Sequence, residues 1–131
     1  MATLHLEFVS PESVLFSGDV NQVDLPGVEG DMGILPGHAP LVTILRPGIV
    51  TIFNGGTRTP IVVTGGFAEV GPDGLSVLAD RAMPRENFDT AMLSAEIEDA
   101  EEDVADATDA QVRDKLVRHL EQLKTLQAAL A

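Results

Sequence analysis

The chain has 131 residues, 44% of them hydrophobic, and a formal net charge of −13 at pH 7. This acidic balance excludes nucleic acid as a partner, because Lys and Arg must neutralise phosphates to drive such binding, and it opposes binding to an anionic bilayer surface. The sequence contains no cysteine, which excludes disulfides, thiol nucleophiles and Cys-ligated metals.

The first 25 residues predict three short strands. Leu4, Leu6 and Phe8 recur with the two-residue period of a half-buried strand. Polar residues interrupt this start, so no signal peptide is expected, and no stretch approaches the roughly 20 apolar residues of a membrane span. We therefore expect a soluble, cytoplasmic protein. Two more strands are expected at residues 14–16 and 20–25, with a turn at Ser17-Gly18-Asp19 between them.

Residues 27–41 contain four glycines and two prolines. Glycine permits backbone angles that a Cβ forbids, so the spacing predicts consecutive tight turns. Pro36 and Pro40 remove backbone donors and exclude a helix or a central strand. A loop of this composition is more often functional than merely connecting, although a tight, well-packed turn is the simpler interpretation. Glu29 and Asp31 could form an acid pair, but solvated turn carboxylates are the favoured interpretation.

The next part of the chain continues the strand pattern. Apolar or β-branched runs occur at residues 41–45, 49–53, 60–64, 67–70 and 75–79. Asn54-Gly55-Gly56-Thr57 and Gly71-Pro72-Asp73-Gly74 are typical hairpin turns. Short strands separated by turns at this spacing indicate an antiparallel sandwich or barrel. We expect a mainly β N-terminal sandwich of eight to ten short antiparallel strands over residues 1–86.

The hydrophobic period changes after Pro84, and residues 87–131 predict an antiparallel two-helix hairpin. Asn87 is expected to cap the first helix, with Asp89 in its first turn. Thr108-Asp109-Ala110-Gln111 has the spacing of a capping box, so the second helix is expected to begin near Ala110. Each helix carries one apolar stripe. The stripes are Leu93, Ile97, Ala100, Val104 and Ala107, then Val112, Leu116, Leu120, Leu123, Leu126 and Leu130.

The two expected helices differ in charge. Residues 87–109 carry nine acids and no base, whereas residues 110–131 carry two acids and four bases. The acidic run is best explained as a solvated helix face, because a calcium loop would need a glycine that the run lacks. The simplest interpretation of the bases is that they balance the first helix. These bases are Arg113, Lys115, Arg118 and Lys124.

No catalytic set is visible in the sequence. His5, His38 and His119 lie on an expected strand, loop and helix, and none has a neighbour at metal-ligand spacing. The serine nucleophile elbow, the P-loop and the dinucleotide fingerprint are all absent. We therefore expect a protein that is not an enzyme and has neither a metal nor a cofactor.

Gly30 to Leu41 reads Gly-Asp-Met-Gly-Ile-Leu-Pro-Gly-His-Ala-Pro-Leu and resembles the signature loop of the epsilon subunit of F-type, proton-translocating ATP synthases. Val77-Leu78-Ala79-Asp80-Arg81-Ala82 resembles the second marker of that family, and the resemblance covers the whole chain. It implies a non-catalytic rotor subunit of the central stalk that binds the gamma subunit and the c-ring and helps to pass torque to the alpha/beta catalytic head. It also implies a peripheral position on the cytoplasmic face of the bacterial inner membrane, held there only through the complex.

The resemblance also implies roles for individual residues. The signature loop meets the c-ring, which makes Glu29, Asp31 and His38 the expected contacts, although His38 could instead pin the loop by a hydrogen bond. Residues 87–131 would be a regulatory hairpin that blocks ATP hydrolysis when extended. The expected blocking residues, which would face an acidic stretch of the catalytic subunit, are Arg113, Lys115, Arg118 and Lys124.

Some members of the family bind ATP in the folded hairpin through a motif of Ile or Leu, Asp, two variable residues, Arg and Ala. The matching positions here run from Phe88 to Leu93. Asp89 is kept, but Met92 stands where the arginine would be and cannot make bidentate contacts to phosphate. We therefore expect ATP binding to be weak or absent.

Three other functions are alternatives to the family interpretation of the sequence. A β-sandwich module that binds carbohydrate or peptide would normally expose aromatic platforms, and the chain has no Trp or Tyr. A small enzyme would need the catalytic set that is missing. A homodimer joined through the tail helices is compatible with their apolar stripes, whereas the family interpretation predicts a monomer in isolation.

Overall fold

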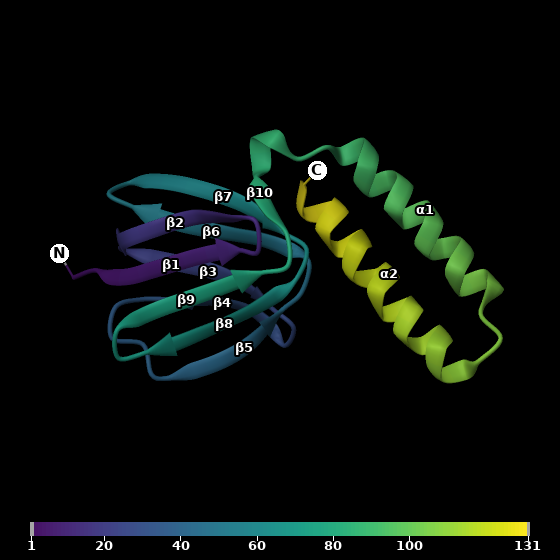
Figure 1. Ribbon diagram of the computed structural model, residues 1–131, viewed down its shortest axis with the longest axis horizontal. Coiled ribbons are helices and arrows are strands. Elements are labelled where there is room, and N and C mark those ends of the chain that lie inside the picture. The colour runs from purple at the N-terminus through teal and green to yellow at the C-terminus, as the bar shows by residue number, and fades with distance from the viewer. Residues whose placement is uncertain (1, 131) are drawn as a thin grey trace. The chain divides into compact units, whose positions relative to one another are not determined.

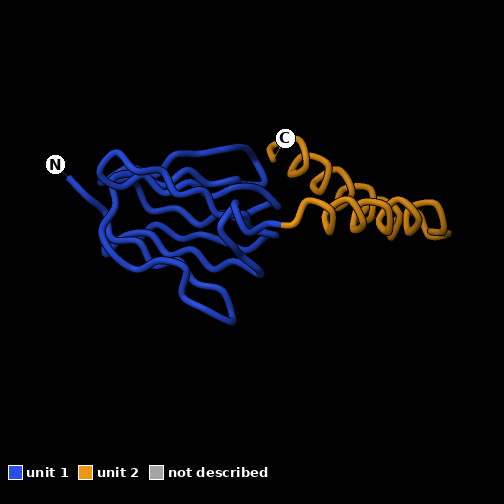
Figure 2. The backbone as a smooth tube through the Cα atoms, turned by 90° about the horizontal axis from the view of Figure 1, so that it is seen from above, with its two compact units in different colours: residues 1–88 blue, residues 89–131 orange. Residues whose placement is uncertain are grey.

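The computed structural model describes residues 2–130 and divides the chain into two compact units. Met1 and Ala131, the outer ends of the two expected domains, lie outside the described residues. The first unit is Met1–Phe88 and the second is Asp89–Ala131 (Figure 2). The sequence pattern had placed the division two residues earlier, between residues 86 and 87.

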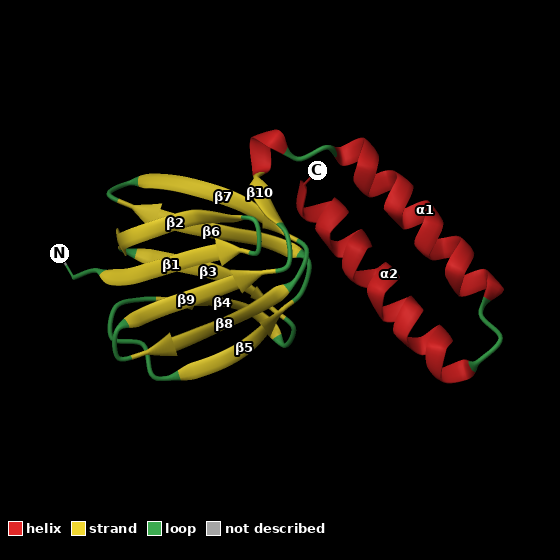
Figure 3. Ribbon diagram, in the orientation of Figure 1, coloured by secondary structure: helices red, strands yellow, loops and turns green. Residues whose placement is uncertain are grey.

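The first unit is a sandwich of short strands (Figures 1 and 3). The strands are β1 Leu4–Ser10, β2 Ser13–Val20, β3 Gln22–Gly27, β4 Gly30–Ile34, β5 Leu41–Leu45, β6 Gly48–Asn54, β7 Thr57–Val63, β8 Gly66–Gly71, β9 Gly74–Ala79 and β10 Ala82–Pro84. Their order is β10-β7-β6-β3-β5-β8-β9-β1-β2, and β4 pairs with β3 outside this path. All pairs are antiparallel except β1 with β9, which is parallel. The expected sandwich of eight to ten strands is confirmed.

The core of the sandwich is aliphatic and follows the period of the strands. Leu4, Leu6 and Phe8 point inward from β1, while the intervening His5 is exposed. Among the described residues no polar or charged residue is buried. Apolar burial therefore dominates the stability of this unit, at about 1.5–3 kcal/mol for each large side chain that leaves water.

Two local expectations for the strands were wrong. Ser17-Gly18-Asp19 is not a turn but lies inside β2, where Ser17 and Gly18 pair with Glu7 and Leu6 of β1. Ser17 and Asp19 suit this edge strand because their side chains reach Glu7 and His5 of β1. The short strand β10 was missed, since three residues ending in proline carry too little periodic signal.

The second unit consists of α1 (Thr90–Asp106) and α2 (Ala110–Leu130), which pack against each other as the expected hairpin. Both expected caps were wrong by one or two residues. Asn87 belongs to the 3₁₀ turn η1 (Arg85–Asn87), and the Asp89 carboxylate instead caps α1 by accepting from the Ala91 and Met92 amides. Asp109, not Thr108, caps α2 by accepting from the Gln111 and Val112 amides.

The apolar stripes of the hairpin are buried most completely away from the connection between the two helices. Five stripe residues are buried, namely Leu93, Ile97, Ala100, Leu123 and Leu126. Near the connection between the helices, Val104 is half-buried and Val112 is exposed. No helix within the described part of the chain is both long enough and apolar enough to cross a membrane.

Candidate docking surfaces

The turn between β3 and β4 exposes Val28 and Glu29 at its tip. Gly27 and Gly30 face each other in register on either side of this tip. A Cβ on Gly27 would lie 2.8 Å from the Gly30 carbonyl oxygen and 2.9 Å from Met32 Cε, so glycine is required for so close a turn. Glu29 makes no ion pair with any described residue and stays in solvent.

Arg46 fastens the base of this turn. Its Nη1 donates to the Gly27 carbonyl oxygen at 2.6 Å, and its Nη2 donates to Asp31 Oδ1 at 2.5 Å. The Arg46 side chain is 22% exposed, whereas that of Asp31 is 80% exposed. In the sequence, Arg46 directly follows the apolar run 41–45 and begins an Arg-Pro-Gly triplet, which indicates no partner for it. The structure makes it the internal partner of Asp31, which distinguishes Asp31 from the unpaired Glu29.

His38 lies in a second turn. The His38 amide donates to the Leu35 carbonyl oxygen at 3.1 Å, and Gly37 has a φ of +81°. Pro36 followed by a glycine with positive φ is the signature of a type II turn. The exposed His38 ring hydrogen-bonds through Nδ1 to the Ala39 carbonyl oxygen at 2.8 Å. This bond holds the ring beside its own backbone and leaves Nε2 without a hydrogen-bond partner among the described residues.

Strand β4 separates these two turns, which corrects the expectation of one continuous loop. The five residues of β4 pair with β3 and span roughly 13 Å at the usual rise of a strand. The structure therefore brings Glu29 and Asp31 together at one end of β4 and places His38 beyond the other end. A single small contact cannot include all three residues.

An exposed line of apolar side chains crosses the outer face of five adjacent strands, and we call it the outer apolar row. Register places its members opposite one another in the order Ile44, Phe67, Leu78, Val9 and Val14, from β5 to β2. Ile44 is 63% exposed, Phe67 42%, Leu78 40% and Val14 65%, whereas Val9 is half-buried. Neighbouring exposed apolar side chains of this kind are typical of surfaces that contact another macromolecule.

A polar network lies on the same outer face beside the row. The His5 ring bridges Glu7 Oε1 at 2.6 Å and Asp19 Oδ1 at 3.4 Å, and Ser17 Oγ donates to the same Glu7 oxygen at 2.6 Å. The hydrogen bond to Glu7, and then that to Asp19, raises the pKa of His5 above its ordinary value of 6.5. The Ser17 hydroxyl, and then His5, lowers the pKa of Glu7 below 4.5.

This network predicts a pH window for the pairing of β1 with β2. Glu7 contributes stability above pH 4.5, which is lost as the pH falls through its lowered pKa. His5 contributes stability below pH 6.5, which is lost as the pH rises through its raised pKa. The network should therefore stabilise most between these values, and the effect should be small because all the groups are exposed.

An NMR titration of the His5 ring measures this directly, with an apparent pKa above 6.5 as the expected result. The same titration of a Glu7→Gln variant should bring the His5 pKa down toward its ordinary value. A wild-type His5 that titrates at or below 6.5 would contradict the network.

The expected regulatory residues are all on the surface of the hairpin. Arg113, Lys115, Arg118 and Lys124 are exposed on α2, and none makes an ion pair with another residue in the 2–130 range. Asp89 uses its carboxylate to cap α1, and Met92 is exposed beside it. Weak or absent ATP binding stays a prediction. Within residues 2–130, no three His, Asp or Glu side chains are placed to hold a metal ion.

The sequence matches known proteins over nearly its whole length. Residues 3–85 match the family model described as ATP synthase, Delta/Epsilon chain, beta-sandwich domain. The chain is 48% identical over 130 residues to ATP synthase epsilon chain 1 of Nitrobacter hamburgensis, covering 99% of this chain and 96% of that protein. It is 47% identical to the ATP synthase epsilon chain of Nitrobacter winogradskyi over the same shares.

The fold also matches solved structures. A chain in the cryo-EM structure of Euglena gracilis mitochondrial ATP synthase, OSCP/F1/c-ring, superposes with a TM-score of 0.82 at 30% identity, covering 100% of this chain and 83% of that one. A chain in the Tetrahymena thermophila mitochondrial ATP synthase central stalk/c-ring structure has a TM-score of 0.71 at 12% identity, which supports the fold alone.

Proposed function

Because the chain belongs to the ATP synthase epsilon chains, we propose that it is a non-catalytic rotor subunit of the central stalk. In this role it couples rotation of the c-ring to the gamma subunit and the alpha/beta catalytic head. The observation that carries the proposal is the outer apolar row, which gives a sandwich without a catalytic set a surface for a protein partner. The subunit acts at the cytoplasmic face of the bacterial inner membrane as a peripheral part of the complex.

The outer apolar row is the surface that we assign to gamma. Its members are held in register by five strands, so the surface is rigid before binding and little conformational entropy is lost on association. The polar network of His5, Glu7 and Asp19 lies beside it and provides a solvated rim. An apolar centre with a polar edge is the usual anatomy of a protein interface.

The c-ring is the partner that we assign to Glu29, Asp31 and His38. Glu29 is the carboxylate free to meet a cation of the ring, since Arg46 already neutralises Asp31. His38 lies beyond the far end of β4 and offers its Nε2 nitrogen, since Nδ1 is bonded to the Ala39 carbonyl oxygen. The two ends of β4 contact the ring together only if β4 lies along the ring surface. A test therefore needs one variant at Glu29 and a separate variant at His38.

The hairpin, residues 87–131, is the regulatory part of this proposal. Arg113, Lys115, Arg118 and Lys124 carry unpaired charge on the surface of α2, and they are suited to an acidic stretch of the catalytic head when the hairpin extends. Inhibition of ATP hydrolysis then depends on an equilibrium between two hairpin states that the partner surface shifts.

A reconstitution experiment tests the rotor role and the regulatory role together. ATP synthase stripped of its own epsilon chain is supplied with the tagged full chain or with residues 1–88, which contain a complete core of their own. We expect both to bring down gamma and the catalytic subunits, and we expect the shorter chain to raise ATP hydrolysis about fivefold or more.

Replacing the four α2 bases by Gln in the full chain is the companion test, because the hairpin stays while its positive charges are lost. It should raise hydrolysis nearly as much as truncation does. If neither chain brings down gamma, the rotor role is wrong. If truncation leaves hydrolysis unchanged, the inhibitory role is wrong.

A further inference from the structure

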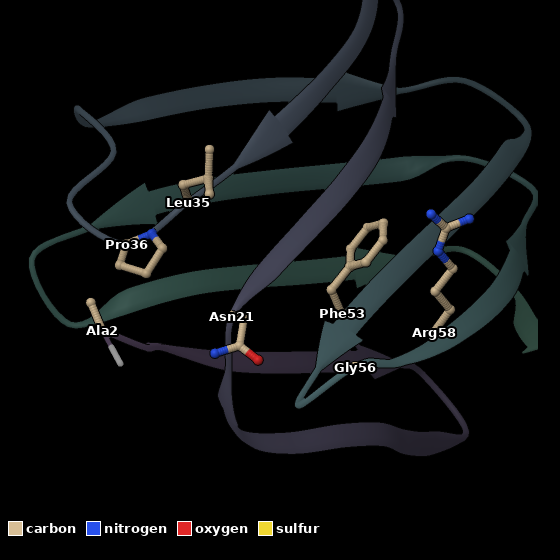
Figure 4. A pocket seen from close by; sticks show the side chains of 7 residues that line it. All are labelled: Ala2, Asn21, Leu35, Pro36, Phe53, Gly56 and Arg58. Atoms are coloured by element: carbon tan, nitrogen blue, oxygen red, sulfur yellow. The ribbon is translucent and has the colours of Figure 1, made fainter.

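An open dish lies at one end of the sandwich, between the end of β4 and the β6–β7 hairpin (Figure 4). Its volume is about 570 Å³. Leu35 and Pro36 form one side, the Phe53 ring rises from β6, and Arg58 stands beside that ring on β7. Asn21 lies at the foot of the dish, immediately before β3. We call this surface the end dish.

The polar side chains among the described residues of the end dish are Asn21 and Arg58. Asn21 Oδ1 accepts from the Gly55 amide at 2.7 Å, which orients the side chain, and no hydrogen bond to a described residue uses its amide nitrogen. The Arg58 guanidinium carbon lies 5.2 Å from the Phe53 ring centroid, a cation–π distance that fixes the cation against the apolar wall. The chain has 21 acids, yet none of them lines the dish.

An apolar surface whose one charged lining residue is a cation fits an occupant that has a negative charge beside an apolar group. Arg58 makes no ion pair with any described residue, so its charge is available to a partner. The surface is also continuous with the proposed ring contact, because Leu35 and Pro36 belong to the turn that carries His38. An anionic lipid surface is the less suitable occupant, given the net charge of −13.

We propose that the end dish receives a carboxylate-bearing loop of a c-ring subunit. This inference rests on the ring contact of the proposed function. The loop carboxylate binds the Arg58 guanidinium, a loop carbonyl accepts from the Asn21 amide nitrogen, and an apolar loop side chain packs on Leu35 and Phe53. The interaction adds a basic contact to a ring-facing surface whose other charged members, Glu29 and Asp31, are acids.

Binding of the full chain to the purified, detergent-solubilised c-ring tests this proposal. Arg58→Gln should weaken binding about tenfold, Arg58→Glu more, and Arg58→Lys less than either. Gln111→Glu, on exposed α2, changes the net charge by the same one unit as Arg58→Gln and should bind like the wild type. Binding of every variant to gamma should be unchanged, which shows that the sandwich remains folded.

The outcomes separate this inference from the proposal on which it rests. If the wild type binds the ring and both Arg58→Gln and Arg58→Glu bind equally well, the end dish is not part of the contact, while the ring contact stands. If the wild type does not bind the ring, the ring contact itself is wrong and this inference falls with it. If instead the wild type binds vesicles containing phosphatidylglycerol and Arg58→Gln abolishes that binding, a lipid headgroup replaces the proposed loop.

Discussion

Replacing Gly66 by alanine is expected to destabilise the sandwich by roughly 3 kcal/mol or more, a large share of the 5–15 kcal/mol that holds a typical domain together. Gly66 opens β8 and pairs with Leu45 on one side and Ala79 on the other. A Cβ there would lie 2.1 Å from the Leu78 carbonyl oxygen and 2.8 Å from Ala79 Cα. Both atoms belong to the backbone of β9, so relief of the clash requires the strands to separate. The φ of +140° adds strain for any residue with a Cβ.

Gly71→Ala is the matched control, because Gly71 closes the same strand. No heavy atom lies within 4 Å of the Cβ position there, and its φ is outside the positive region. The control should change the free energy of unfolding by less than about 0.5 kcal/mol. Urea denaturation followed by circular dichroism measures both variants. Equal midpoints for the two would contradict the close approach of β8 to β9 at Gly66.

Local pattern was enough to predict much of this fold. The run Leu41–Leu45 became β5 with the same bounds, and the change of period after Pro84 marked the start of the helical part. Local pattern failed where distant residues decide the outcome. Ser17-Gly18-Asp19 has the composition of a turn, but its pairing with β1, ten or more residues earlier, makes it a strand.

In the candidate site too, local pattern predicted some features, and distant residues determined the others. The composition of residues 27–41 indicated tight turns, and Gly27 and Gly37 do make them. The pairing of Arg46 with Asp31 spans 15 residues and follows from the β3–β5 junction, which no local signal encodes. The outer apolar row was likewise hidden, because its members come from five segments. The sequence of β5 held a partial signal. Its consecutive apolar residues must alternate between the two faces of the sheet, which places Val42 and Ile44 on the face opposite the core.

An aspartate in place of Phe67 is expected to abolish assembly with gamma, with a loss of affinity of about 100-fold or more. Phe67 lies between Ile44 and Leu78 in register, as the second of the five members of the outer apolar row. A carboxylate there would be buried by the partner without a counter-charge, which costs far more than the lost contact of the ring. In the free protein the side chain faces outward at 42% exposure, so the fold should tolerate the change. Co-purification of gamma with the tagged variant measures the effect.

Thr59→Asp controls for the added charge, because Thr59 is exposed on β7, well away from the row in the strand order. It should co-purify with gamma like the wild type, and Phe67→Leu should retain most of the affinity because it keeps an apolar side chain at the same point. The Phe67→Asp variant must also show the wild-type urea midpoint within error, so that lost assembly reports the surface and not the fold. A folded Phe67→Asp protein that still brings down gamma in full yield would mean that gamma binds another face. In that case the row would need a different partner, since a soluble protein rarely exposes a row of apolar side chains that binds nothing.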